Sequence, residues 1–183
     1  MNEKIEQYVR NHGRDFMEWL CDIISIPSPT GHEQAKGEWI LNLLHQWGAA
    51  GAYRDAAGNV VYPCHVKSGE KVALYTAHID TVFQDLQEIH IRQTGHILSA
   101  PSCSDNSASI AGLLFIIKMF HDLQLTPPPG LLFAFDVGEE GLGNLKGMRQ
   151  VMADWHGRIA EVVAVDCTFD TFVTTAVGSR RYA

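Results

Sequence analysis

The sequence predicts an α/β fold in which a mostly parallel or mixed central sheet lies between two layers of helices. Short apolar runs of strand length alternate along the chain with longer segments of helical periodicity, which is the pattern of such three-layer αβα domains. The runs 131–137 and 162–165 are apolar almost throughout, as is typical of strands covered on both faces. With 183 residues, 46% of them hydrophobic, the chain is long enough for one domain with its own core.

Two helical segments are expected before the first strand. Apolar residues recur near helical spacing from Ile5 to Ile24, and Gly13 interrupts them. Two prolines and a glycine within 25–31 predict a stop and a turn. The next helix is expected over 33–47, where several large apolar residues share one face.

The elements expected in the rest of the chain follow from the same two periodicities. Apolar β-rich runs predict strands, and broader apolar faces of period 3.6 predict helices. In chain order, these elements are strands at 60–62 and 72–76, a hairpin joining 89–91 to 97–98, a helix at 106–123, a strand at 131–137, a helix at 145–155 and a buried strand at 162–165.

The composition argues against several classes of protein. A formal net charge of -7 with scattered basic residues disfavours binding to nucleic acids or anionic membranes. No apolar run approaches the roughly 20 residues of a membrane span, and the polar N-terminus has no apolar signal-peptide region. The cysteines Cys21, Cys64, Cys103 and Cys167 lie far apart, without a CxxC pair. A cytoplasmic protein with reduced thiols is therefore expected.

Acidic residues and a histidine stand at one predicted edge of the sheet. They follow strands or open a helix, and they are His78, Asp80, Asp105, Glu139, Glu140 and Asp166. In open α/β sheets, sites are built at the edge where the carboxyl ends of the strands lie. Taken singly, each has a plainer explanation. Asp105 could be a helix cap, the His-x-Asp pair could make local hydrogen bonds, and the two glutamates could form a solvated face.

The joint occurrence of these residues favours a metal site over the plainer explanations. Carboxylates gathered at one edge would repel one another, and one or two divalent cations remove that repulsion. One imidazole with several carboxylates and no thiolate motif suits zinc, and also manganese or cobalt. A carboxylate shared by two ions about 3.5–4 Å apart is the usual frame of a two-metal hydrolytic centre, and a further carboxylate can act there as general base.

Four motifs carry a resemblance to a known family. They read AHIDTV (77–82), SCSDNSASIAGLL (102–114), FAFDVGEEGLGNLKG (133–147) and VVAVDCT (162–168). In this order and spacing they resemble the zinc-dependent exopeptidase and deacylase family that includes carboxypeptidase G, peptidase T, aminoacylase and acetylornithine deacetylase. The resemblance covers nearly the whole chain. It implies the zinc-exopeptidase fold and a metallopeptidase or deacylase activity.

The resemblance also implies which residues hold two zinc ions. His78 and Asp166 would bind the first ion. Asp105 would bridge both ions, and Glu140 would bind the second. The form Cys-Ser-Asp-Asn-Ser around Asp105 replaces the Gly-rich stretch and basic residue of many members. It is similar to the related aminopeptidases that have no inserted domain, so the subfamily stays open.

Two further roles are implied by the same resemblance. Asp80 would hydrogen-bond His78 and orient it, as residues beside metal ligands commonly do. Glu139 would be the general base, which takes a proton from the attacking water and passes it to the leaving amine. The expected reaction is hydrolysis of an amide bond, and the expected partner is a small peptide or an N-acyl amino acid.

Family members are much longer than this chain, which bears on the expected activity. After a segment like VGSRRY (177–182) they enter a lid or dimerisation domain, then return to the catalytic domain with a last metal-binding histidine. Residues 1–183 are therefore expected to form one domain, the N-terminal portion of the catalytic domain, in which Glu140 lacks its histidine partner. We expect weak or no activity, and the alternative is a non-catalytic metal-binding or interaction domain. The uncharged segment 172–177 predicts self-association through an edge strand.

Overall fold

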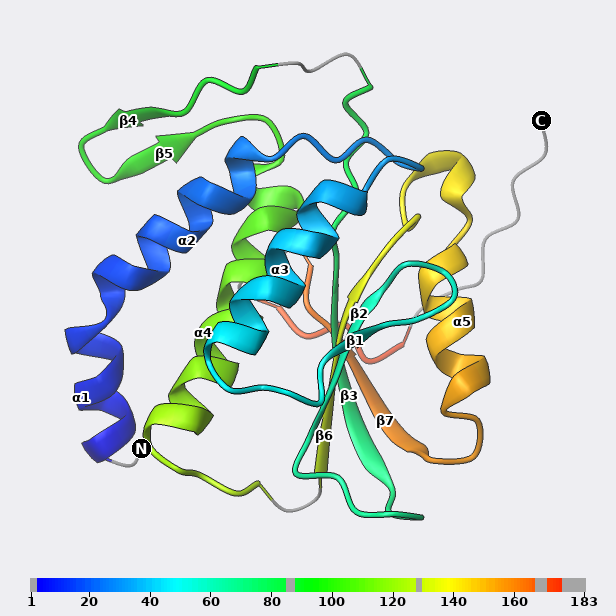
Figure 1. The fold of residues 1–183 in the computed structure, drawn as a ribbon. Coiled ribbons are helices and arrows are strands. Elements are labelled where there is room, and N and C mark those ends of the chain that lie inside the picture. Colours follow the sequence, from blue (N-terminus) through cyan, green and yellow to red (C-terminus); the bar gives the residue numbers. More distant parts are fainter. Residues whose placement is uncertain (1–2, 85–87, 128–129, 167–170, 176–183) are drawn as a thin grey trace.

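Figure 1 shows a central sheet with helices on both faces and a small separate hairpin. The computed structural model describes residues 3–84, 88–127, 130–166 and 171–175. The elements within these residues are α1 (Glu3–Asn11), α2 (Gly13–Ser25), α3 (Gln34–Gln46), β1 (Tyr53–Arg54), β2 (Val60–Cys64), β3 (Val72–His78), β4 (Arg92–Thr94), β5 (Ile97–Ser99), the irregular turn η1 (Cys103–Ser107), α4 (Ala108–Asp122), β6 (Gly130–Asp136), the single turn η2 (Gly141–Gly143), α5 (Lys146–Asp154) and β7 (Ile159–Ala164).

The central sheet is mixed and has the strand order β1-β2-β6-β3-β7. β3 runs parallel to β6 and to β7, while β2 is antiparallel to both β6 and β1. In the register of the central pair, His78 lies opposite Asp136 where the two strands end. The carboxyl ends of β3, β6 and β7 therefore share one edge of the sheet, as the sequence pattern predicts.

Two apolar clusters cover the two faces of the sheet. Side chains of β6 alternate, so that Phe133 and Phe135 belong to the larger cluster, together with residues of α2, α3 and α4. Leu132 and Ala134 belong to the smaller cluster, which includes Val151 of α5. This period of two is the geometry of a strand covered on both sides. With α5 on the opposite side of the sheet from α3 and α4 (Figure 1), the predicted three-layer αβα fold is confirmed.

The helices agree with the sequence pattern except near their ends. The break expected at Gly13 separates α1 from α2. α4 begins at Ala108 rather than at 106, because Asp105 and Asn106 have non-helical backbone angles within η1. Among the helices of the described residues, none has the length and apolar character needed to cross a membrane.

The expected hairpin forms, but its first strand lies further along the chain than predicted. β4 and β5 pair antiparallel around the turn at 95–96. The prediction of a strand at 89–91 is wrong, because Ile89 and Ile91 pack against the larger core cluster. Burying these two apolar side chains is favourable, and the polar residues that follow them form the ladder instead.

The strand expected to be buried at 162–165 is an edge strand. β7 pairs only with β3 in the sheet, most of its residues are exposed, and Val162 is exposed to 48%. The prediction of a buried strand is wrong here, because no residue of β7 is fully buried and, among the described residues, no strand pairs with its outer edge. The edge strand predicted over 172–177 is also not formed in 172–175, where Phe172 is 96% exposed. Residues 176–177 lie outside the described residues.

A lysine is buried within the layer of helices that covers the larger cluster. Lys36 in α3 is 2% exposed and makes no ion pair among the described residues. Burial lowers the pKa of Lys36 to about 8, and the negative charge of Asp80 opposes this shift. Because the net shift is downward, the charged form of Lys36 lowers the stability of the fold.

We expect Lys36→Met to raise the free energy of unfolding of the metal-free chain by about 1–3 kcal/mol at pH 7. The folded-state pKa of about 8 lies below the reference value of 10.5, so the penalty in the wild type is full below pH 8 and fades as the pH rises towards 10.5. Urea unfolding at pH 7 and pH 10 measures the gain, which should be smaller at pH 10. Lys67→Met, at an exposed position, is the control. A lower stability of Lys36→Met at pH 7 would mean that attraction to Asp80 outweighs burial.

Candidate metal centre

The carboxyl edge of the sheet carries the residues that the sequence singles out. His78 is the last residue of β3, and Asp80 lies two positions beyond it. Glu139 and Glu140 stand in the loop between β6 and α5, and Asp166 follows β7. We call residues 138–146 the glutamate loop. Parallel pairing of β3, β6 and β7 is the reason that these distant positions in the sequence share one edge.

Asp105 reaches the same edge from a different kind of element. The sequence pattern places it at the start of a helix, but it lies in η1 with φ -118° and ψ 91°, and α4 begins only at Ala108. No side-chain capping hydrogen bond forms at the start of η1 or of α4. The explanation of Asp105 as a helix cap is therefore wrong, and its carboxylate faces His78 instead.

His78 is the residue that the two ligand groups share. It is 5% exposed, and its Nε2 atom lies 2.9 Å from Asp105 Oδ1 and 3.9 Å from Asp166 Oδ1. One possible ligand atom from each of these three residues lies within 4.8 Å of the other two. A second group of the same spacing joins His78 to Glu139 and Glu140. All five side chains thus meet at one edge, although Asp105 and Glu140, which were expected to share an ion, fall in different groups.

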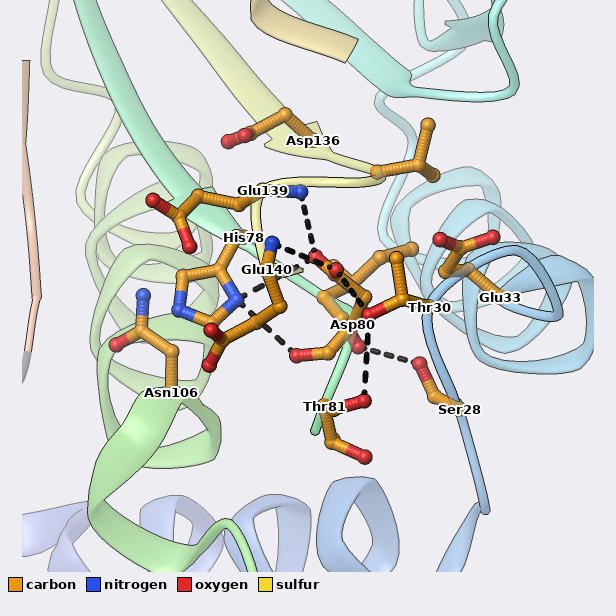
Figure 2. Close-up of polar contacts among 12 residues, drawn as sticks. Ser28, Thr30, Glu33, His78, Asp80, Thr81, Asn106, Asp136, Glu139 and Glu140 are labelled. Carbon is orange, nitrogen blue, oxygen red and sulfur yellow. Dashed lines mark hydrogen bonds and ion pairs between the residues drawn. The ribbon is translucent and has the colours of Figure 1, made fainter. Parts of the chain in front are cut away.

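Asp80 is the buried carboxylate beneath this arrangement (Figure 2). It is 1% exposed, and its Oδ1 and Oδ2 atoms accept the backbone N–H groups of Glu139 and Glu140, each at 3.0 Å. Thr30 Oγ1 donates a further hydrogen bond to Oδ2 at 2.9 Å. His78 Nδ1 lies 3.1 Å from the backbone oxygen of Asp80 and 3.5 Å from its Oδ1. The carboxylate of Asp80 is therefore closer to the backbone of the glutamate loop than to the imidazole.

Burial and charge act in opposite directions on the pKa values of this cluster. Burial lowers the pKa of His78, but its hydrogen bond to Asp80 and the surrounding carboxylate charges outweigh burial and raise the pKa to about 9. Burial raises the pKa of Asp80, but its hydrogen bonds outweigh burial and hold the pKa below the usual value. Burial, with the neighbouring carboxylates, raises the pKa values of Glu139 and Glu140. This surplus of negative charge is what a divalent cation would neutralise.

The sequence reasoning missed a buried amide that supports the glutamate loop. Asn59 is fully buried, and its Nδ2 donates to Gly147 O at 2.8 Å and to Asp55 Oδ2 at 2.6 Å. Its Oδ1 accepts the backbone N–H of Val137 at 2.9 Å. Because Val137 precedes the glutamate loop and Gly147 follows it, Asn59 holds both ends of the loop. The turn signal Asp-x-x-Gly-Asn at 55–59 could have indicated a structured loop.

Asp136 is a second buried residue that the sequence reasoning missed. It is 3% exposed at the end of β6, and the Thr76 hydroxyl donates a hydrogen bond to its carboxylate. Burial raises the pKa of Asp136 to about 6. A carboxylate inside an otherwise apolar strand is unfavourable without a partner. Its position in the run 131–137 was the signal that could have drawn attention to it.

Close packing of the glutamate loop and of the first turn of α5 requires glycine at one position in each. A Cβ atom at Gly143 would lie 2.5 Å from Gly138 O, and a Cβ atom at Gly147 would lie 2.2 Å from Asn59 Oδ1. Atoms cannot approach this closely, so neither position accepts a side chain without movement of the backbone. The loop can therefore return to α5 along this path only with glycine at both positions.

Other histidines make contacts away from this cluster. His121 Nε2 lies 3.0 Å from the Tyr62 hydroxyl, and His45 Nε2 lies 2.9 Å from Ala52 O. Among the residues that the structure describes, no histidine besides His78 belongs to a group of three possible ligand atoms.

Comparison with known sequences assigns the chain to a family. A sequence model of Peptidase family M20/M25/M40 matches residues 74–178, which is more than half of the chain and includes the whole cluster. The chain belongs to the M20/M25/M40 peptidase family. This M20-type chain is also similar to a Pyrococcus abyssi protein described as a LysW-lysine/LysW-ornithine hydrolase. The two are 32% identical over 134 residues, which make up 73% of this chain and 35% of that protein. The chain thus spans about a third of the length of that relative.

Solved structures show the same fold as this M20-type chain. Human carnosine dipeptidase 1 is 14% identical with a TM-score of 0.73, over 90% of this chain and 41% of that chain. A tripeptidase from Staphylococcus aureus is 20% identical with a TM-score of 0.66, over 85% and 43% of the two chains. At these identities the likeness establishes the fold alone. Members of the M20 family are generally metal-dependent hydrolases, and this chain has two groups of residues that could hold a cation.

Proposed function

We propose that this chain is part of a metal-dependent hydrolase that cleaves the amide bond of a small peptide or an N-acyl amino acid. The observation that carries the proposal is the meeting of His78, Asp105 and Asp166 within 4.8 Å, beside the two glutamates. One imidazole nitrogen and two carboxylate oxygens are enough for a catalytic-type zinc site, whose fourth position is left to water. Manganese or cobalt would fit the same donors.

The proposed roles combine the placement of the side chains with the roles that the family resemblance implies, of which the sharing of an ion by Asp105 and Glu140 rests on the resemblance alone. His78, Asp105 and Asp166 would hold the first cation, and Glu140, with Asp105, would hold a second. A bound dication would supply polarisation of the amide carbonyl and a lower pKa for water. Glu139 would accept the proton of the attacking water and deliver it to the leaving nitrogen. A raised pKa, which burial gives Glu139, suits a group that must both take and release a proton.

A second candidate function is a metal-binding or interaction domain without hydrolytic activity. It is supported by the ligand count, because Glu140 has no histidine partner besides His78 in the described residues. Residues 1–183 would then be the N-terminal portion of a catalytic domain. The exposed Phe172 and Val173 support self-association of such a chain, as does the outer edge of β7, with which no strand of the described residues pairs.

Calorimetric titration of the 183-residue chain with zinc separates these functions. We expect one tightly bound zinc ion per chain, a second bound much more weakly, and little turnover of a dipeptide or an N-acetyl amino acid. Asp166→Asn should remove the tight site, while His156→Ala, at an exposed position outside the cluster, should keep it. Two tight zinc ions, or robust turnover, would show that the second site is complete. No binding by the wild type would end the metal-site proposal.

A further inference from the structure

The turn between α2 and α3 is joined to the chain beyond β3 by several hydrogen bonds. The Ser28 hydroxyl donates to Ile79 O, and Thr81 N donates to Ser28 O at 2.9 Å. Thr30 N donates to Thr81 O at 3.2 Å, and Pro29 forms a parallel bridge with Thr81. The sequence predicts only a turn at these prolines. The structure makes residues 28–30 a short partner of 79–81, directly beside Asp80.

The side chain of Thr30 extends this pairing to the glutamate loop. Its hydroxyl donates to Asp80 Oδ2 at 2.9 Å, and the same oxygen accepts the N–H of Glu140 at 3.0 Å. The other oxygen of Asp80 accepts the N–H of Glu139. Figure 2 shows Asp80 between Thr30 on one side and the two glutamates on the other. Thr30 makes no hydrogen bond with His78 among the described residues.

We propose that Thr30 is a positioning residue of the metal centre, because it fixes the Asp80 carboxylate that holds the backbone of Glu139 and Glu140. The proposal rests on the proposed function, since it gives these two glutamates their roles as base and ligand. A carboxylate buried to 99% has few ways to be oriented except by its hydrogen-bond donors, and Thr30 is its side-chain hydroxyl donor.

The physical need for such a residue lies in the glutamate loop itself. Glycines at 138, 141 and 143 leave its backbone with many accessible conformations. Two hydrogen bonds from backbone N–H groups to Asp80 select one of these conformations. They can do so only while the carboxylate group of Asp80 is held in one orientation. Hydrogen bonds to a charged acceptor are stronger than neutral ones, so the loss of one donor is expected to be measurable.

Holding the backbone of the glutamate loop is a different role for Asp80 from orienting the imidazole of His78. If Asp80 acted only through the imidazole, a change at Thr30 would disturb the ring of His78 and leave the glutamate backbone as it was. If it acts through the glutamate loop, the two amides of Glu139 and Glu140 respond first. Thr30 separates the two routes, because among the described residues it donates a hydrogen bond to Asp80 and forms none with His78.

The test compares Thr30→Val, which removes the hydroxyl at constant shape, with Thr30→Ser, which keeps it. In the metal-free chain, NMR hydrogen exchange at the amides of Glu139 and Glu140 should quicken about three- to tenfold in Thr30→Val and stay near wild type in Thr30→Ser. Thr94→Val, in the exposed strand β4, is the matched control. Thermal unfolding checks that each variant is folded.

Zinc titration of the same variants gives the second readout. We expect Thr30→Val to weaken zinc binding about three- to tenfold and Thr30→Ser to keep it, because a loosened Glu140 is a poorer ligand. Unchanged amide exchange in folded Thr30→Val, or a shift confined to the His78 ring, would overturn the proposal. If the wild type bound no zinc, the proposed function would fail, while the amide measurement would still decide whether Thr30 holds the loop.

Discussion

Glu139→Gln is expected to lower the turnover number at least a hundredfold in any preparation of this protein that hydrolyses an amide. Gln keeps the shape of Glu139 but cannot accept a proton from water. General-base catalysis contributes about 10²–10⁴-fold to rate, so the loss should fall in that range. The backbone N–H that Asp80 accepts is unaffected by the change, and the loop should therefore keep its path.

The kinetic measurement is paired with zinc titration of the same variant. Glu139→Gln should bind zinc with an affinity close to that of the wild type, whereas Glu140→Gln should weaken the second ion. Glu161→Gln, at an exposed position in β7, controls for the change of charge and should leave turnover unchanged. Turnover within a few-fold of wild type in Glu139→Gln would remove Glu139 from the mechanism. Loss of zinc together with turnover would make it a ligand rather than a base.

Asn59→Ala is expected to lower the free energy of unfolding by about 3–5 kcal/mol, because it removes the partners of several buried groups at once. The N–H of Val137 would be left without its hydrogen bond, and the carbonyl of Gly147 and the carboxylate of Asp55 would each lose the bond from the Asn59 amide. Each unsatisfied buried group destabilises the fold by about 1–3 kcal/mol. Both ends of the glutamate loop would be released at the same time.

Urea unfolding of the metal-free chain measures this effect without reference to activity. Asn42→Ala is the matched control, because Asn42 is exposed on α3 and its replacement should change stability by about 0.5 kcal/mol or less. Addition of zinc should stabilise the wild type more than Asn59→Ala, since a displaced loop offers poorer ligands. A loss below about 1 kcal/mol in Asn59→Ala would show that water replaces the amide and that Asn59 does not hold the loop.

The local sequence pattern was sufficient to predict the structure wherever a single physical requirement, such as burial of apolar side chains, decides the position of a segment. The apolar runs of β3 and β6 must be buried, so their places in the sheet could be predicted from sequence. Because the carboxyl ends of parallel strands meet, the convergence of His78, Glu139 and Asp166 could be predicted as well. The same reasoning failed at β7, whose apolar residues predicted a strand buried on both faces of the sheet. Burial depends on what else packs against a strand, and its own sequence does not contain that information.

The sequence by itself determined the αβα layering and the positions of the candidate ligands along the chain, because both follow from periodicities of 2 and 3.6 and from strand ends. Only the tertiary structure decided which groups hold those ligands in place. Asp80 and Asn59 lie far from the glutamates in sequence, and they form hydrogen bonds with the backbone of the glutamate loop or its flanking residues. Thr30, equally distant in sequence, donates to the Asp80 carboxylate. Every residue except proline offers the same backbone N–H group, so no pattern of side chains marks the one that a buried carboxylate or amide will choose.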